Sequence, residues 1–174
     1  MKSESSANTI SFEEATECLA IDYFSRKVLL GSTSGKISLQ NLTPEGAIAS
    51  TSVIHAHESP VISLDWAHPS IGDIFVSAEQ AGIVRVWFRR NTAEGYMTVF
   101  EKKLEAQRFP PPFDLILIVS FVSLYHIIAT CVRFAPPEYG CKFAISSTDG
   151  QIYILKRGIF IFIILLYRPF LYLE

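Results

Sequence analysis

The sequence is poor in charged residues and in cysteine. Asp, Glu, Lys and Arg make up 18% of its 174 residues, against about a quarter in ordinary globular proteins. The net charge is −2, and no basic cluster supplies the electrostatic footprint of a nucleic-acid-binding protein. The three cysteines, Cys18, Cys131 and Cys141, form no CxxC pair, which argues against a disulfide framework or a zinc site. We therefore expect a reducing compartment and no direct nucleic-acid partner.

Motifs that would support catalysis or cofactor binding are also missing. The sequence has no GxSxG elbow for a serine nucleophile and no GxxxxGK[ST] loop to hold phosphates. His55 and His57 form an HxH pair beside Glu58, and two imidazoles at this spacing on a strand can reach one metal ion. No further cluster supplies a third ligand, so we favour a structural role for His57. The sequence predicts no catalytic residue, metal, cofactor or small-molecule substrate, and hence no enzyme.

The first residues, MKSESSANTISFEEATE, are polar and acidic. They lack the apolar stretch that a secretory signal peptide needs. We therefore expect the chain to begin in the cytosol.

Three segments of the sequence share one pattern. In each, an apolar run leads into a polar turn that ends in Gly, and apolar residues follow two and four positions later. Alternation with a period of two on both sides of a Gly turn is typical of an antiparallel hairpin. The interval of 47 residues between the first two turns is close to the roughly 40–45 residues of a four-stranded propeller blade. The segments are VLLGSTSGKISLQ around Gly35, IFVSAEQAGIVRVW around Gly82 and FAISSTDGQIYIL around Gly150.

The second and third copies also match upstream of the turn, at a constant separation of 68 residues. The loops WAHPSIG and FAPPEYG therefore occupy the same place in their repeats. The separation exceeds the first interval by 21 residues, and the excess lies where FPPPFDLILIVSFVSLYHII interrupts the pattern. The matching positions are Leu64 with Val132, Trp66 with Phe134, and Gly72 with Gly140.

Two longer segments, HESPVISLDWAHPSIGDIFVSAEQAGIVRVW and VRFAPPEYGCKFAISSTDGQIYIL, resemble consecutive blades of a known family. It is the WD-repeat β-propeller subunit of the COPII vesicle outer coat, which is shared with the Y-shaped scaffold of the nuclear pore. AIDYFSRKVLLGSTSGKISLQNL is similar to the blade before them, so the resemblance covers about residues 17–107 and 129–156. It implies an all-β fold, a partial WD-repeat β-propeller of about three four-stranded blades.

WD repeats usually carry a His, a Ser, a turn Asp and a Trp that hydrogen-bond inside each blade. The middle blade keeps His57, Ser77 and Trp87, but Ala81 stands at the turn position, and the third blade has Leu155 in place of Trp. We expect both tryptophans to pack between blades. The structural blade positions that follow from the resemblance are His57, Trp66, Gly72, Ser77, Gly82, Trp87, Phe134, Gly140, Asp149 and Gly150.

Two apolar segments, 113–128 and 159–167, depart from the blade pattern. As helices they would span about 24 and 14 Å, short of the roughly 30 Å hydrocarbon core of a membrane. We expect them to be helical or irregular, and their composition looks like that of translated intron. The predicted division is 1–109, two blades with a polar N-terminus; 110–128, an apolar insertion; 129–157, part of a third blade; and 158–174, an apolar tail outside the family pattern.

The resemblance implies a scaffold that binds proteins and catalyses nothing, in vesicle transport from the endoplasmic reticulum to the Golgi and in the nuclear pore. Its partner would be an elongated α-solenoid protein of the coat or of the pore scaffold. It would lie on the cytoplasmic face of the endoplasmic reticulum, held to the membrane peripherally through the coat, and at the nuclear pore. Tyr139, in the FAPPEYG loop, is the candidate for a partner contact. Another WD-repeat adaptor and a small membrane-anchored variant are the alternatives.

Overall fold

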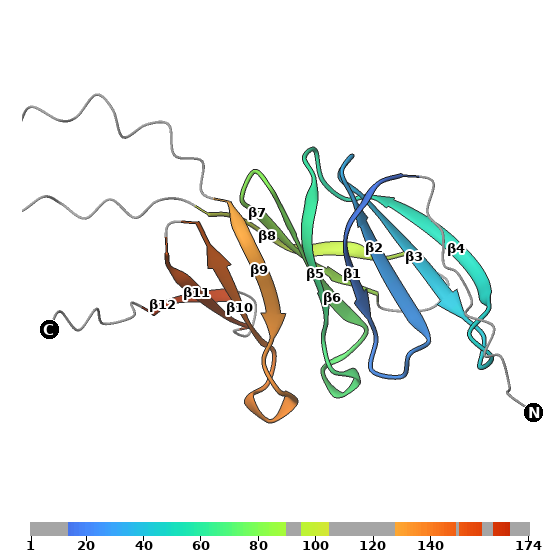
Figure 1. Cartoon of the computed structure of the whole chain (residues 1–174). Helices are drawn as coiled ribbons and strands as arrows, with labels where there is room; N and C mark the ends of the chain where they lie inside the picture. Colours follow the sequence, from blue (N-terminus) through green and yellow to red (C-terminus); the bar gives the residue numbers. More distant parts are fainter. Residues whose placement is uncertain (1–13, 90–94, 105–127, 149, 158–161, 168–174) are drawn as a thin grey trace, which may run out of the picture.

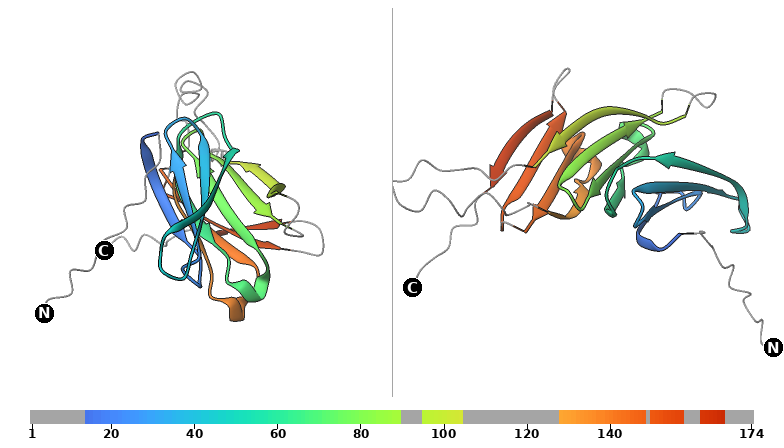
Figure 2. Two further views of the ribbon diagram at one scale, coloured as in Figure 1. Left: turned by 90° about the vertical axis from the view of Figure 1, so that its right-hand side faces the viewer. Right: turned by 90° about the horizontal axis from the view of Figure 1, so that it is seen from above.

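Three four-stranded antiparallel sheets make up most of this protein (Figure 1). The computed structural model describes residues 14–89, 95–104, 128–148, 150–157 and 162–167. Seen from above, the sheets lie side by side with their faces packed together (Figure 2). The predicted fold class, a partial β-propeller with three four-stranded blades, is confirmed.

Each blade is a meander in which every strand pairs with the next one along the chain. Blade 1 consists of β1 (Thr16–Ile21), β2 (Lys27–Ser32), β3 (Lys36–Leu42) and β4 (Ile48–His55). Blade 2 consists of β5 (Val61–Trp66), β6 (Ile74–Glu79), β7 (Ile83–Phe88) and β8 (Met97–Lys103). Blade 3 consists of β9 (Ala129–Phe134), β10 (Lys142–Ser147), β11 (Ile152–Arg157) and β12 (Phe162–Tyr167). The first strand of each blade lies against the first strand of its neighbour, β1 on β5 and β5 on β9.

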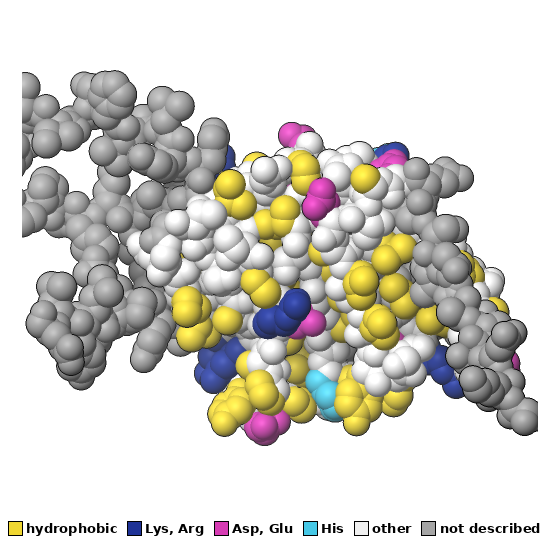
Figure 3. All heavy atoms as spheres, in the orientation of Figure 1, with side chains coloured by type: hydrophobic (Ala, Val, Ile, Leu, Met, Phe, Trp, Pro, Cys, Tyr) yellow, Lys and Arg dark blue, Asp and Glu magenta, His cyan; other side chains and the backbone are white. Residues whose placement is uncertain are grey.

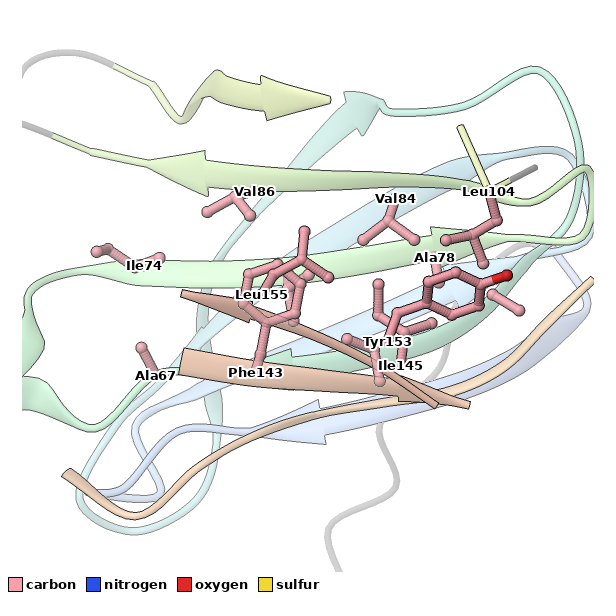
Figure 4. Packing of buried hydrophobic residues seen from close by; sticks show 13 residues of the cluster. Ala67, Ile74, Ala78, Val84, Val86, Leu104, Phe143, Ile145, Tyr153 and Leu155 are labelled. Atoms are coloured by element: carbon pink, nitrogen blue, oxygen red, sulfur yellow. The ribbon is translucent and has the colours of Figure 1, made fainter. Parts of the chain in front are cut away.

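Apolar side chains from facing sheets form two cores, because alternate residues of each strand point to opposite faces. The core between blades 1 and 2 contains three aromatic residues of blade 2, Trp66, Phe75 and Trp87. Its buried members are Ala20, Leu29, Ile37, Leu39, Ala56, Val61, Leu64, Trp66, Phe75 and Trp87. The core between blades 2 and 3 is mainly aliphatic, with the ring of Phe143 beside Leu155 and that of Tyr153 beside Ile145 (Figure 4). Trp66 and Trp87, the two tryptophans expected to pack between blades, are buried.

The loops WAHPSIG and FAPPEYG have the same conformation. Each contains a single turn of 3-10 helix just before its glycine, η1 (Pro69–Ile71) in blade 2 and η3 (Pro137–Tyr139) in blade 3. Gly72 and Gly140 end these turns with positive φ angles of 128° and 72°, and each backbone N–H donates to the first carbonyl of its turn. The constant separation of 68 residues thus corresponds to two equivalent corners at one end of the molecule.

The C-terminal tail differs from the prediction. The sequence predicts a helical or irregular tail from residue 158, whereas Phe162–Tyr167 forms β12 and pairs antiparallel with β11 along its whole length. The free edge of β11 offers unpaired backbone groups, and a short apolar and β-branched run suits a strand better than a helix. The third blade therefore extends to Tyr167 and does not end at 157. The apolar insertion lies outside the described residues, apart from Ile128. No helix in the described ranges is long and apolar enough to span a membrane.

Candidate functional site

Blade 2 contains a buried hydrogen-bond relay built from three of the residues singled out in the sequence. The indole Nε1–H of Trp87 on β7 donates to Ser77 Oγ on β6 at 2.8 Å. The same Oγ lies 2.6 Å from Nε2 of His57, which precedes β5. All three side chains are buried. The relay therefore ties the connection between blades 1 and 2 to the middle strands of blade 2.

Polar groups face both nitrogens of the His57 ring. An indole can only donate, so Ser77 Oγ accepts from Trp87, and between Ser77 Oγ and His57 Nε2 either atom can be the donor. Nδ1 of the same ring lies 3.3 Å from Glu79 Oε2 but makes no regular hydrogen bond to it. Glu79 Oε2 accepts from the backbone N–H of Ser59 at 3.2 Å.

Glu79 was missed by sequence reasoning. It is fully buried at the end of β6, two residues before Ala81, which stands where WD repeats have their turn Asp. A carboxylate in this blade thus faces the histidine from a different position. Its strand, IFVSAE, otherwise consists of apolar and small residues. A charged residue in such a strand is the signal that could have revealed Glu79, because a buried carboxylate needs polar partners.

Burial, followed by the positive charge of Arg85, lowers the pKa of His57 to about 3. The ring is therefore neutral at physiological pH and cannot act as a cation. His55, the other member of the HxH pair, is exposed at the end of β4. Among the residues that the structure describes, no three His, Cys, Asp or Glu side chains come together as metal ligands. The geometry brings His57 to its hydrogen-bond partners and not to His55.

The glycine positions mark the hairpin turns of the three blades. Gly35, Gly82 and Gly150 all have positive φ angles of 84°, 83° and 75°. Gly35 is also tightly enclosed, since a Cβ atom there would lie 2.7 Å from the carbonyl carbon of His57. Asp149, the predicted turn aspartate of blade 3, lies outside the described residues.

A second polar cluster, which the sequence did not reveal, joins blade 1 to blade 2. We call Lys27, Asp73, Arg89 and Tyr96 the clamp. Lys27 Nζ on β2 lies 2.8 Å from Asp73 Oδ1, and the Tyr96 hydroxyl donates to the same oxygen at 2.5 Å. Arg89 Nη2 donates to Asp73 Oδ2 at 2.6 Å. The side chains of Lys27, Tyr96 and Arg89 therefore all donate to one carboxylate, that of Asp73.

The clamp is partly enclosed by aromatic rings. Lys27 Nζ lies 5.3 Å from the centroid of the Trp66 ring, and the Arg89 guanidinium lies 4.9 Å from that of Tyr96. Partial burial opposes ionisation of Asp73, but hydrogen bonds from Lys27, Tyr96 and Arg89 outweigh it and lower its pKa. Burial and the hydrogen bond to Asp73 raise the pKa of Tyr96. The Asp73 carboxylate at the centre of the clamp therefore stays ionised at neutral pH.

One end of the molecule exposes a group of aromatic side chains. The β1–β2 loop carries Tyr23 and Phe24, which are 67% and 64% exposed, and η3 carries Tyr139, which is 61% exposed. The Tyr23 ring contacts Phe24 and His68 edge-on, with centroids 5.2 and 4.7 Å apart. Figure 3 shows hydrophobic side chains gathered at this lower end, with a histidine among them. The predicted contact residue Tyr139 therefore belongs to a larger apolar surface.

Two hollows open on this surface, and Tyr23 and Trp66 line both. The first, of about 340 Å³, lies beside the clamp and includes Asp22 and Asp73. The second, of about 350 Å³, lies where β1, β5 and β9 end. Its lining residues are Ile21, Tyr23, Asp65, Trp66, Ala67, His68, Phe134, Ala135 and Pro136.

The chain is similar to fungal proteins that act in protein transport. It is 26% identical to Protein transport protein sec13 of Emericella nidulans over 137 residues, which is 78% of this chain and 40% of that protein. Protein transport protein SEC13 of Coccidioides immitis is 26% identical over 136 residues, and that of Mycosarcoma maydis is 21% identical over 146. The chain spans about two fifths of the length of these curated relatives. No family model matches it.

Among solved structures, the crystal structure of the Myceliophteria thermophila Cps50 (Swd1) β-propeller domain resembles the chain with a TM-score of 0.63. The two are 14% identical, and the match covers 97% of this chain and 43% of that one. This likeness shows the propeller fold. Together with the transport proteins, it confirms the resemblance seen in the sequence, that of a sec13-like WD-repeat propeller.

Proposed function

We propose that the chain is propeller sequence of a scaffold subunit in the COPII vesicle coat, and that it acts by binding proteins and not by catalysis. The observation that carries the proposal is the likeness to Protein transport protein sec13 over 78% of the chain, on a structure of three consecutive propeller blades. In this role the partner is the elongated α-solenoid subunit of the coat, or the corresponding subunit of the nuclear-pore scaffold. The sites of action are the cytoplasmic face of the endoplasmic reticulum, its vesicles and the nuclear pore.

The polar residues of the described chain support a structural role. The relay of His57, Ser77 and Trp87 lies inside a blade, and the clamp around Asp73 lies between two blades. Buried polar groups in such networks stabilise one packed arrangement, because each needs its partners to offset its desolvation. We assign the blade positions named from the sequence to this purpose, and Tyr139 to contact with a partner.

The proposal is tested by direct binding. The tagged chain is mixed with the purified α-solenoid subunit of the coat, and the complex is measured by pull-down and light scattering. We expect a stoichiometric complex with the unmodified chain. Val84 is fully buried in the core between blades 2 and 3, so Val84→Asp places an unpaired charge there and should abolish binding.

A matched control separates specific binding from adhesion of apolar segments. Lys103, at the end of β8 in the same blade, is exposed, and Lys103→Asp should leave the complex unchanged. Retention of the partner by Val84→Asp would show that binding does not require the blades, which contradicts the proposal. Absence of any complex with the unmodified chain would also contradict it, and would favour a different WD-repeat adaptor.

Fractionation tests the membrane-anchored alternative. A peripheral coat protein is released from membranes by salt, whereas an anchored one stays with the pellet in carbonate. The pairing of β12 with β11 places residues 162–167 in a blade, which favours release. Carbonate-resistant pelleting of the chain would overturn the coat proposal.

A further inference from the structure

The second hollow lies at the point where the innermost strands of all three blades end. Ile21 closes β1, Trp66 closes β5 and Phe134 closes β9, and each lines the hollow. Because β1, β5 and β9 are neighbours, this surface draws on every blade. In Figure 1 the three strands end together above the lower loops.

Aromatic and proline side chains dominate the rim of the hollow. Tyr23 is 67% exposed, and His68 packs against its ring. Trp66 is nearly buried and Phe134 is half-buried, and both line the hollow together with Pro136. A flat side chain can therefore contact the exposed ring of Tyr23 in this hollow.

The hollow contains one carboxylate, that of Asp65. Its Oδ2 accepts from the backbone N–H of Phe134 at 2.7 Å. No Lys or Arg in the described ranges lies within ion-pair distance of it. The nearest cation to act on it, Arg133, donates through Nη1 to the carbonyls of Leu64 and Val132. Asp65 thus lacks the ion-pair partner that a half-buried carboxylate usually has.

The first hollow provides the contrast. Its two carboxylates are already satisfied, since Asp73 takes the donors of the clamp and Asp22 Oδ1 accepts from the backbone N–H groups of Arg26 and Lys27. Burial without a matching ion pair raises the pKa of Asp65, whereas that of Asp73 is lowered. The two hollows share the Tyr23 and Trp66 rings, but of Asp73 and Asp65 only Asp73 has an ion-pair partner.

We propose that the second hollow binds an arginine side chain from an extended segment of a partner protein. Its guanidinium pairs with the Asp65 carboxylate and stacks on the exposed ring of Tyr23. A guanidinium suits this site better than an ammonium, because it is planar, offers forked donors to a carboxylate and stacks on aromatic faces. Opposite charge supplies the specificity, and the exposed rings supply contact area. The assignment does not depend on which assembly contains the protein.

Fluorine NMR of the full chain tests this site directly. The chain has two tryptophans, so labelling with 5-fluorotryptophan gives two signals, which Trp87→Phe assigns. N-acetylarginine amide is titrated against N-acetylcitrulline amide, which has nearly the same shape but no charge. We expect a saturable shift of the Trp66 signal with the arginine compound only, while the Trp87 signal stays in place and reports that blade 2 is intact.

Two variants and a control locate the binding. Asp65→Asn keeps an oxygen for the Phe134 amide and should weaken arginine binding at least tenfold. Tyr23→Ala alters an exposed side chain, leaves folding unaffected and should weaken it severalfold. Glu138, an exposed carboxylate at the same end that lines neither hollow, provides the matched control, and Glu138→Gln should bind like the unmodified chain.

Three results would overturn the proposal. They are equal shifts with citrulline and arginine, unchanged arginine affinity in Asp65→Asn while the Trp87 signal is undisturbed, and binding of N-acetyllysine amide as tight as that of the arginine compound.

Discussion

Phe75 in blade 2 and Phe143 in blade 3 are equivalent residues, 68 positions apart, and both are fully buried against the preceding blade. Phe75 stacks on Trp87 at 5.7 Å between centroids, and Trp66 and Tyr96 contact it edge-on. The Phe143 ring lies 5.6 Å from that of Phe134 between centroids and packs in a mainly aliphatic core. The same position in the fold therefore accepts two kinds of packing.

The polar positions around these phenylalanines differ in the same way. Blade 2 has the relay that joins Trp87, Ser77 and His57. The residues of blade 3 that correspond to Trp87 and Ser77 are Leu155 and Ile145, both fully buried in the aliphatic core. Replacing a whole hydrogen-bonded network by apolar groups costs little, whereas removing one member leaves buried groups unsatisfied. Blade 3 is an example of apolar replacement, since Leu155 and Ile145 stand where blade 2 has Trp87 and Ser77.

Polar links between neighbouring blades also differ. Blade 1 is joined to blade 2 by the clamp, which uses charged side chains around Asp73. Blade 2 is joined to blade 3 by side chains of β5 that accept from the edge of β9. Ser63 Oγ accepts from the Val132 N–H at 3.0 Å, and Asp65 accepts from that of Phe134. We infer that the contact between blades 1 and 2 depends more on individual polar residues. The contact between blades 2 and 3 depends more on the volume of the apolar side chains that fill it.

The largest expected effect comes from the two phenylalanines. Phe75→Ala and Phe143→Ala should each lower the free energy of unfolding by about 3–5 kcal/mol, the usual cost of emptying a buried aromatic site. Substitution by leucine distinguishes the two sites. Phe75→Leu should cost about 0.5–1.5 kcal/mol more than Phe143→Leu, since it loses the stacked contact with Trp87 and the edge-on contacts with Trp66 and Tyr96. Urea unfolding followed by circular dichroism measures both, and equal costs for the two leucine variants would break the comparison.

Next come the hairpin glycines. Gly35→Ala should cost about 2–5 kcal/mol, from left-handed strain of about 1–2 and overpacking of about 1–3, because the new Cβ meets the His57 backbone. Gly150→Ala should cost about 1–2 kcal/mol, since nothing lies within 4 Å of its Cβ position. Thermal melts compare the two. If Gly150→Ala loses as much stability as Gly35→Ala, left-handed backbone strain alone sets the cost of both substitutions, and overpacking contributes nothing.

A smaller effect is expected from the relay serine. Ser77→Ala leaves the Trp87 N–H and His57 Nε2 without their partner, at a cost of about 1–3 kcal/mol. Ser38 in blade 1 is equally buried, but its Oγ has no hydrogen-bond partner among the described residues. Ser38→Ala should therefore be neutral or slightly stabilising. If the two alanine variants unfold at the same urea concentration, the relay contributes no stability.

The smallest effect is the pH dependence that the relay confers. The pKa of His57 falls from its ordinary 6.5 to about 3 in the folded chain, so between these values the unfolded chain binds a proton that the folded chain does not. Its contribution to stability is complete above about pH 7 and is lost as the pH falls from 6.5 towards 3. The melting temperature of His57→Gln should drop less between pH 7 and 4.5 than that of the unmodified chain. Parallel drops would contradict the neutral imidazole.

Much of the fold could be predicted because it rests on local chemistry. The turns at Gly35, Gly82 and Gly150 and the paired corners that end in Gly72 and Gly140 carry their signals within a few residues of sequence. The strand β12 was not foreseen, because an apolar run of six residues fits several structures until a free strand edge is available to it. Glu79 and the clamp were missed for a similar reason. Lys27 and Asp73 are 46 residues apart, and only packing brings them to 2.8 Å.

Val84 and Ile152 show how the sequence and the tertiary structure divide the outcome. Both follow their turn glycine by two residues, and alternation along a strand makes both face the same way in their blades. Val84 is fully buried, whereas Ile152 is 39% exposed, because blade 3 covers Val84 and no described blade covers Ile152. The sequence by itself determined the hairpin strands around Gly35, Gly82 and Gly150, their turns and the side of each strand on which an apolar residue lies. Which of those sides became a core, and which carboxylates acquired a partner, was decided by the packing of one blade on the next, since burial is a property of two surfaces together.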